Sequence, residues 1–91
     1  MEKRNRITQE EIDALADSAV MKVWEPFPGV TCCCFQLPSG FCITEQSACC
    51  DPANYDRSIG IDICIEHFKN QLWQLEGYVL KAEIGPNGTG A

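Results

Sequence analysis

A long row of apolar residues in the second half of the chain constrains the fold more than any other feature. Between Ser58 and Lys81, apolar side chains recur at steps of three and four residues, at Ile61, Cys64, Ile65, Phe68, Leu72, Leu75 and Val79. This spacing places them on one face of an α-helix. The sequence therefore predicts one long helix over about 58–81 whose apolar face lies against a core.

The other side of this helix also carries apolar residues. Ile63, Trp73 and Leu80 lie away from the main row, and Gly77 follows one turn after Trp73. Either the rest of the chain covers these residues, or they form a surface for a second copy or another partner. A glycine costs a helix about 1 kcal/mol relative to alanine, so Gly77 indicates a close backbone approach or a helix break. We take Trp73, Gly77, Tyr78 and Leu80 as candidate partner-binding residues.

A second, shorter helix is predicted near the N-terminus. Thr8 and Glu11 have the spacing of a capping box, in which each side chain satisfies a free backbone N–H group. Helical spacing of apolar residues follows at Ile12, Leu15, Ala16, Ala19 and Val23. Pro26 and Pro28 stop a helix, so we expect this one to end near Trp24.

Between the two helices the sequence predicts a β-hairpin. Residues 30–37 and 41–46 are rich in β-compatible side chains, and Pro38-Ser39-Gly40 between them is typical of a tight turn. Alternation places Thr31, Cys33, Phe35 and Leu37 on one face, directed at the core. An isolated hairpin is marginal in water, so a helix or another chain must cover it.

Asp51-Pro52 predicts a short helical turn over 52–57, with the aspartate as cap. The expected fold is thus α+β: an N-terminal helix, a β-hairpin, a short helical turn and one long C-terminal helix packed on the hairpin. With 91 residues the chain has the size of one domain, which we expect over 1–84. Residues 85–91 are expected to be a flexible tail.

Charge and composition narrow the possible partners. The chain has 13 acidic and 7 scattered basic residues and a net charge of −6, which argues against binding to nucleic acid or to a membrane. The polar, charged N-terminus contains neither a signal-peptide core nor a membrane-spanning stretch. We therefore expect a cytoplasmic location in which the 7 cysteines are free thiols.

The cysteines raise the alternative of a zinc-binding regulatory protein. Structural zinc sites use pairs of cysteines two to four residues apart, and the chain has no C-x-x-C pair. Cys33 and Cys42 could face each other across the hairpin, with Cys49 or Cys50 nearby. Because neighbours in the Cys32-Cys33-Cys34 run point to opposite faces of a strand, we favour small buried side chains and predict no cofactor.

No catalytic residue is predicted. His67 is the only histidine, and Cys64 lies three residues before it on the same helix. Cys64 belongs to the apolar row, where a thiol is inert. Glycine-rich phosphate loops, nucleophile elbows and two-histidine metal motifs are absent from the sequence.

The segment 45–56, between the predicted hairpin and the long helix, is the other candidate site. Backbone N–H groups at such a junction can bind an anion. Ser47, Asn54 and Arg57 offer donors and Tyr55 offers an aromatic face. Capping by Asp51 and Asp56 is the simpler interpretation, since both oppose an anion.

The same region resembles a known family. Its motifs are Gly40-Phe41, Glu45-Gln46-Ser47-Ala48-Cys49, Pro52-Ala53-Asn54-Tyr55-Asp56, Ile59-Gly60 and Trp73-Gln74-Leu75-Glu76-Gly77-Tyr78-Val79-Leu80. In order and spacing they resemble the phage protein family named after N4 gp49 and Sf6 gene 66. The chain departs from the family pattern at Glu45-Gln46, where a glycine is usual, and at 63–65, where small or basic residues are usual.

The resemblance implies a phage or prophage accessory protein that acts in the bacterial cytosol, and it brings no reaction with it. The leading hypothesis is a non-catalytic, homo-oligomeric binding protein that counteracts host defence. It would block a host bacterial protein or sequester a small nucleotide ligand. A zinc-binding regulator and a minor structural phage protein are the alternatives.

Overall fold

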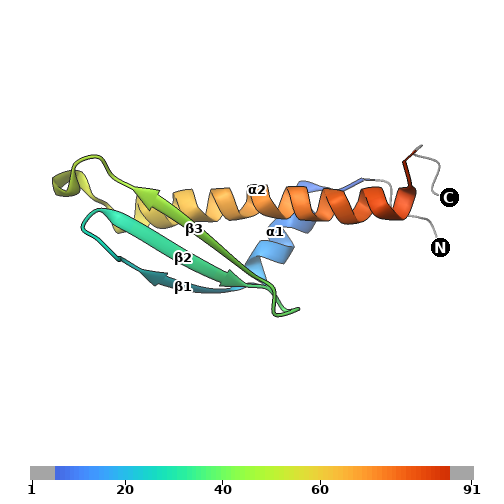
Figure 1. Ribbon diagram of the computed structural model, residues 1–91, viewed down its shortest axis with the longest axis horizontal. Coiled ribbons are helices and arrows are strands. Elements are labelled where there is room, and N and C mark those ends of the chain that lie inside the picture. The colour runs from blue at the N-terminus through green and yellow to red at the C-terminus, as the bar shows by residue number, and fades with distance from the viewer. Residues whose placement is uncertain (1–5, 87–91) are drawn as a thin grey trace.

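The computed structural model describes residues 6–86 and confirms the α+β class. Its elements in chain order are α1 (Gln9–Asp17), β1 (Val20–Trp24), β2 (Val30–Gln36), β3 (Cys42–Ala48), the 3-10 turn η1 (Pro52–Asn54) and α2 (Arg57–Ile84). The strands form one antiparallel sheet in the order β1-β2-β3. The helix α2 crosses one face of this sheet, and α1 lies beside it (Figure 1). Of the predicted tail, residues 87–91 lie outside the described residues.

The N-terminal helix begins as predicted and ends earlier than predicted. The Thr8 hydroxyl accepts a hydrogen bond from the Glu11 N–H group at 3.2 Å. The helix stops at Asp17, and residues 20–24 form strand β1 instead of further helical turns. The prediction that this helix ends near Trp24 was therefore wrong. Ala19 and Val23 fit helical spacing, but residues 20–24 pair along their whole length with β2.

The predicted hairpin is confirmed as β2 and β3, and β1 extends it to three strands. Phe35 lies opposite Ile43 in β3 and opposite Met21 in β1. Thr31, Cys33 and Phe35 are buried, as their alternation predicted. The turn between β2 and β3 is closed by a hydrogen bond from the Gly40 N–H group to the Leu37 carbonyl at 2.8 Å, and Gly40 has φ +93°, a conformation that glycine adopts without strain.

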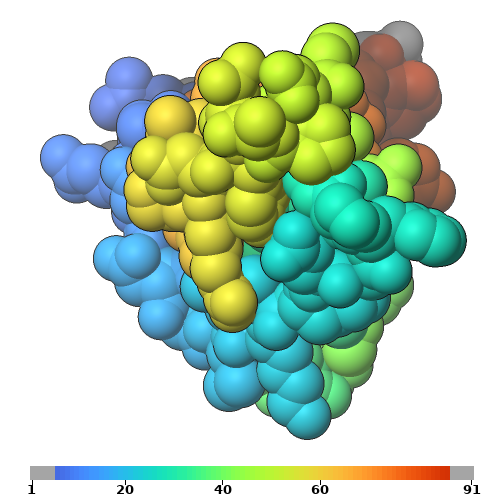
Figure 2. All heavy atoms as spheres, turned by 90° about the vertical axis from the view of Figure 1, so that its left-hand side faces the viewer, coloured from blue at the N-terminus to red at the C-terminus, as the bar shows by residue number. Residues whose placement is uncertain are grey.

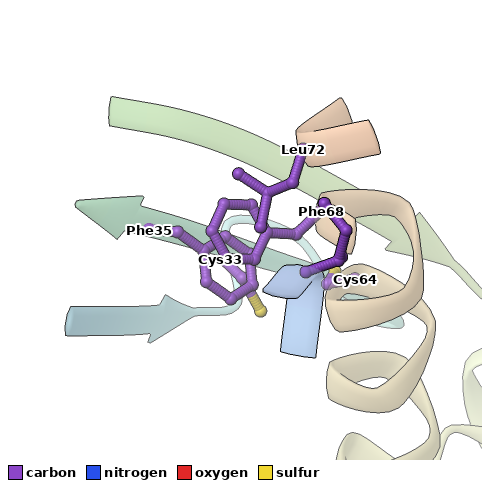
Figure 3. Packing of buried hydrophobic residues seen from close by; sticks show 6 residues of the cluster. Cys33, Phe35, Cys64, Phe68 and Leu72 are labelled. Atoms are coloured by element: carbon purple, nitrogen blue, oxygen red, sulfur yellow. The ribbon is translucent and has the colours of Figure 1, made fainter. Parts of the chain in front are cut away.

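The core lies where α1 and α2 meet the covered face of the sheet. The rings of Phe35 and Phe68 stack with centroids 4.0 Å apart and planes 5° from parallel (Figure 3). Buried residues from α1, β2 and α2 surround them: Ile12, Cys33, Cys64 and Leu72. One aromatic pair from β2 and α2 thus joins the sheet to the long helix.

The helix α2 is longer than the sheet that covers it, in a molecule of 54 × 23 × 19 Å. Leu72 is 1% exposed, but Leu75 is 38% and Val79 46% exposed, so the apolar row emerges into solvent beyond Leu72. Leu80, which the sequence placed away from the row, is buried. The row is therefore buried or half-buried, as predicted, only as far as Leu72. Within residues 6–86 no helix is both long and apolar enough to span a bilayer.

Candidate functional site

A cavity of about 230 Å³ opens at the end of the molecule where β3, η1 and the start of α2 meet. Figure 2 faces this end of the molecule. Three of the predicted site residues, Ser47, Asn54 and Tyr55, line the cavity together. The fourth predicted residue of this segment, Arg57, does not line it.

Backbone and side-chain bonds hold the connection from β3 to α2 in place. The Asp51 carboxylate accepts from the Ala53 N–H group at 3.0 Å and so caps η1, whose first residue is Pro52. The Cys49 thiol donates to the Asp51 carbonyl at 3.0 Å, and the Cys49 N–H group donates to the Gly29 carbonyl at 2.8 Å. The predicted helical turn is thus present but shorter than expected, over 52–54 instead of 52–57, and the capping interpretation of Asp51 is confirmed.

Tyr55 is held in the cavity wall by a hydrogen bond to the sheet. Its hydroxyl lies 2.6 Å from the hydroxyl oxygen of Thr31, a polar residue buried in β2. Gly60 of α2 packs against the same threonine, and a Cβ atom at position 60 would overlap the Thr31 hydroxyl. The absence of a side chain at Gly60 therefore lets the helix approach the sheet closely enough for Tyr55 to reach Thr31.

Asp56 is the charged residue among those that line the cavity. One of its carboxylate oxygens, Oδ1, accepts from the Ser58 N–H group at 2.9 Å, the Ser58 hydroxyl at 2.7 Å and the Ile59 N–H group at 3.5 Å. These bonds, the Ser58 hydroxyl first, lower the pKa of Asp56, so it is ionised at neutral pH. Within residues 6–86, no hydrogen bond reaches its second oxygen, Oδ2. Asp56 lines the cavity and is exposed, which places it at the opening.

Sequence reasoning missed the apolar part of the lining. Ala48, Ile59 and Ile63 contribute to it, together with Gly29 and Gly60. Ile59 and Ile63 are four residues apart and therefore share a face of α2. Ile63 was recognised as lying off the main row, but nothing in the sequence showed that it faces Tyr55 and Asn54.

The second group of predicted site residues is not brought together with the first. Trp73 packs against the core and Leu80 is buried, whereas Tyr78 is 78% exposed on another side of α2. The helix runs through Gly77 without a break, and nothing lies within 4 Å of where its Cβ atom would be. The expectation of a close approach or a break at Gly77 was therefore wrong for the single chain. A shallow depression near the end of α2 includes Tyr78 and Lys81.

The proposed facing of Cys33 and Cys42 was also wrong, because Cys33 pairs with Glu45 and Cys42 pairs with Gln36. All 7 cysteines lie in the described part of the chain, and each is a free thiol. Burial raises the pKa of Cys33, and it raises that of Cys64 to about 12. Across residues 6–86, no three His, Cys, Asp or Glu side chains are grouped so that they could hold a metal ion.

Cys64 and His67 face different partners. The Cys64 thiol donates to the Thr31 carbonyl at 3.7 Å inside the core. His67 Nδ1 lies 3.8 Å from a carboxylate oxygen of Glu45 in β3. Because the Cys64 thiolate is strongly disfavoured by burial, this pair has no means of activating a nucleophile.

Comparison with known families agrees with the motifs of the sequence. The sequence model described as Phage protein (N4 Gp49/phage Sf6 gene 66) family matches residues 7–84. This match spans both helices and all three strands, and the chain belongs to this family. No curated protein and no solved structure matches the chain.

Proposed function

We propose that this member of the N4 Gp49/phage Sf6 gene 66 family acts by binding, without catalysis, in the cytoplasm of the bacterial host. Its effect would be to counteract host defence by blocking a host protein. The observation that carries the proposal is the cavity beside Tyr55, which combines an apolar lining with few polar groups. That combination is typical of binding sites in general.

The size of the cavity suits a single side chain. Its volume of about 230 Å³ exceeds the roughly 150 Å³ of an apolar protein cavity that accommodates benzene. A drug-sized ligand needs about 300 Å³ or more. A side chain presented by a folded partner fills such a space, while the surrounding surfaces supply the rest of the contact.

The charge around the cavity favours a host protein over a nucleotide signal. Asp56 stands at the opening and Asp51 caps the adjoining turn, while Arg57 does not line the cavity. A phosphate would meet the Asp56 carboxylate in a chain of net charge −6. Electrostatic repulsion therefore opposes nucleotide binding, and a neutral or basic protein surface is the better match.

Self-association, the other predicted interaction, has support at the opposite end of α2. The apolar face that the sheet covers at Leu72 continues uncovered through Leu75 and Val79, and Tyr78, one turn after Leu75, is also exposed. A second copy would remove these side chains from water. Light scattering tests this: we expect an oligomer from the unmodified chain and a monomer from Tyr78→Lys, and a monomeric unmodified chain would contradict it.

The test of the main proposal uses the phage or prophage that carries the gene. We compare plating after deletion of the gene and after complementation with the unmodified protein, Ile63→Trp or Asn70→Trp. Ile63 lines the cavity and Asn70 is exposed two turns further along α2, so each variant adds an indole and only one obstructs the cavity.

On a host with an active defence we expect deletion and Ile63→Trp to reduce plating to the same extent, and Asn70→Trp to restore it. Equal plating by the two tryptophan variants would contradict the proposal. So would full plating of the deletion on every defended host, or recovery of the protein as a stoichiometric component of purified virions.

A further inference from the structure

We infer that the cavity beside Tyr55 recognises an arginine side chain of the partner, with the guanidinium between the Tyr55 ring and the free carboxylate oxygen of Asp56. This inference rests on the proposed function, because it names the chemistry of the group that enters the same site. It follows from three properties of the lining: its charge, its rigid aromatic wall and its unused hydrogen-bond acceptors.

The charge comes from Asp56 alone among the lining residues. Its Oδ1 atom is committed to the first turn of α2 through Ser58 and Ile59, which fixes the orientation of the whole carboxylate. Oδ2 is then presented at the opening without a partner from residues 6–86. A fixed carboxylate with one free oxygen favours a cation, and charge-assisted bonds are about twice as strong as neutral ones.

The shape favours arginine over lysine. Tyr55 is held by its bond to Thr31, so its ring offers a fixed surface on which a planar guanidinium can stack. Ile59 and Ile63 supply apolar surface for the methylene groups of the same side chain. An ammonium group is compact and strongly hydrated and gains less from such a wall.

Two further lining groups can accept from the guanidinium. Neither the Ser47 hydroxyl nor the Asn54 side-chain amide is hydrogen-bonded to another residue within 6–86. A guanidinium carries five N–H donors, more than one carboxylate oxygen can satisfy. Ser47 and Asn54 therefore provide acceptors for donors that Asp56 leaves unpaired.

The experiment titrates the full chain with N-acetyl-L-arginine amide and follows the backbone amide resonances of residues 47–63. The uncharged control is the corresponding citrulline amide, which has nearly the same shape, and N-acetyl-L-lysine amide tests the geometry. We expect saturable shifts with a dissociation constant in the millimolar range, and at least tenfold weaker binding of the citrulline and lysine compounds.

Two charge-removing variants make the test specific. Asn is as good an N-cap as Asp, so Asp56→Asn and Asp51→Asn each keep a cap and lose one negative charge. Only Asp56 lines the cavity. We expect Asp56→Asn to weaken arginine binding at least tenfold and Asp51→Asn to change it less than twofold.

Equal binding of the arginine and citrulline compounds, no saturable binding of either, or unchanged binding by Asp56→Asn would overturn the inference. The plating experiment separates this failure from that of the proposed function. If Ile63→Trp reduces plating as far as deletion does and the arginine compound does not bind, the cavity recognises a different chemical group of the partner. If phage complemented with Ile63→Trp plates as well as phage complemented with the unmodified protein, the proposed function fails whatever the titration shows.

Discussion

The hydroxyl groups of Thr31 and Tyr55 lie 2.6 Å apart and join the buried middle strand to the wall of the candidate site. Thr31 belongs to β2 and is 1% exposed, while Tyr55 directly follows η1. A hydroxyl buried to this extent needs a hydrogen-bond partner, and Tyr55 supplies it. The stability of the fold and the shape of the cavity therefore depend on the same pair.

Tyr55→Phe is expected to lower the free energy of unfolding by about 1–3 kcal/mol, because it leaves the buried Thr31 hydroxyl without this partner. Urea unfolding followed by tryptophan fluorescence measures the change. Tyr78→Phe is the matched control, since Tyr78 is exposed at the far end of α2. A loss for Tyr55→Phe no larger than that for Tyr78→Phe would show that the bond contributes no net stability.

Gly60→Ala and Gly77→Ala, both within α2, should change stability in opposite directions. A methyl group at position 60 would overlap the Thr31 hydroxyl, and such overpacking typically costs about 1–3 kcal/mol. At position 77 the methyl meets open space, so helix propensity alone should raise stability by about 0.5–1 kcal/mol. Denaturation midpoints measure both. Stabilisation by Gly60→Ala would contradict the close contact of α2 with the sheet.

The sequence predicted the elements whose local signals agree with their tertiary surroundings. The Thr8 side chain caps the first helix, and the apolar row from Ile61 to Leu72 lies in or against the core, as expected. It did not predict strand β1, because Val23 continues a helical pattern as well as a strand pattern. Pairing with β2 decides between them, and no local signal reports that pairing.

The sequence predicted the candidate site only in part, again because local signals do not report tertiary contacts. Ser47 lies near the end of β3, and Asn54 and Tyr55 follow within eight residues on the connection to α2, so their proximity follows from chain continuity. Trp73 and Leu80 were assigned to a surface because periodicity shows which residues share a helix face and not which face is covered. Beyond Leu72 the row is exposed, and how far the sheet reaches along α2 is a tertiary property.

Leu72→Ala and Leu75→Ala test where the sheet stops covering α2. Leu72 is buried within the core cluster, and truncating such a residue costs about 2–5 kcal/mol. Leu75 is partly exposed, so Leu75→Ala should lower the free energy of unfolding by less than about 1 kcal/mol. Unfolding free energies of the two variants measure the difference. Similar losses at both positions would mean that another surface, such as a second copy, covers Leu75 in solution.

Alkaline pH should destabilise the protein through Cys64. Burial raises the pKa of this thiol from 9.0 to about 12, so the unfolded chain loses the proton at lower pH than the folded one. Its contribution is fully present below about pH 9 and is lost as the pH rises toward 12. One such thiol makes the free energy of unfolding fall by about 1.4 kcal/mol per pH unit in this window. Cys64→Ala lowers stability at every pH by truncation, but its slope between pH 10 and pH 11 should be shallower by about that amount. Parallel slopes for the two proteins would show that Cys64 ionises as readily in the folded chain as in the unfolded one.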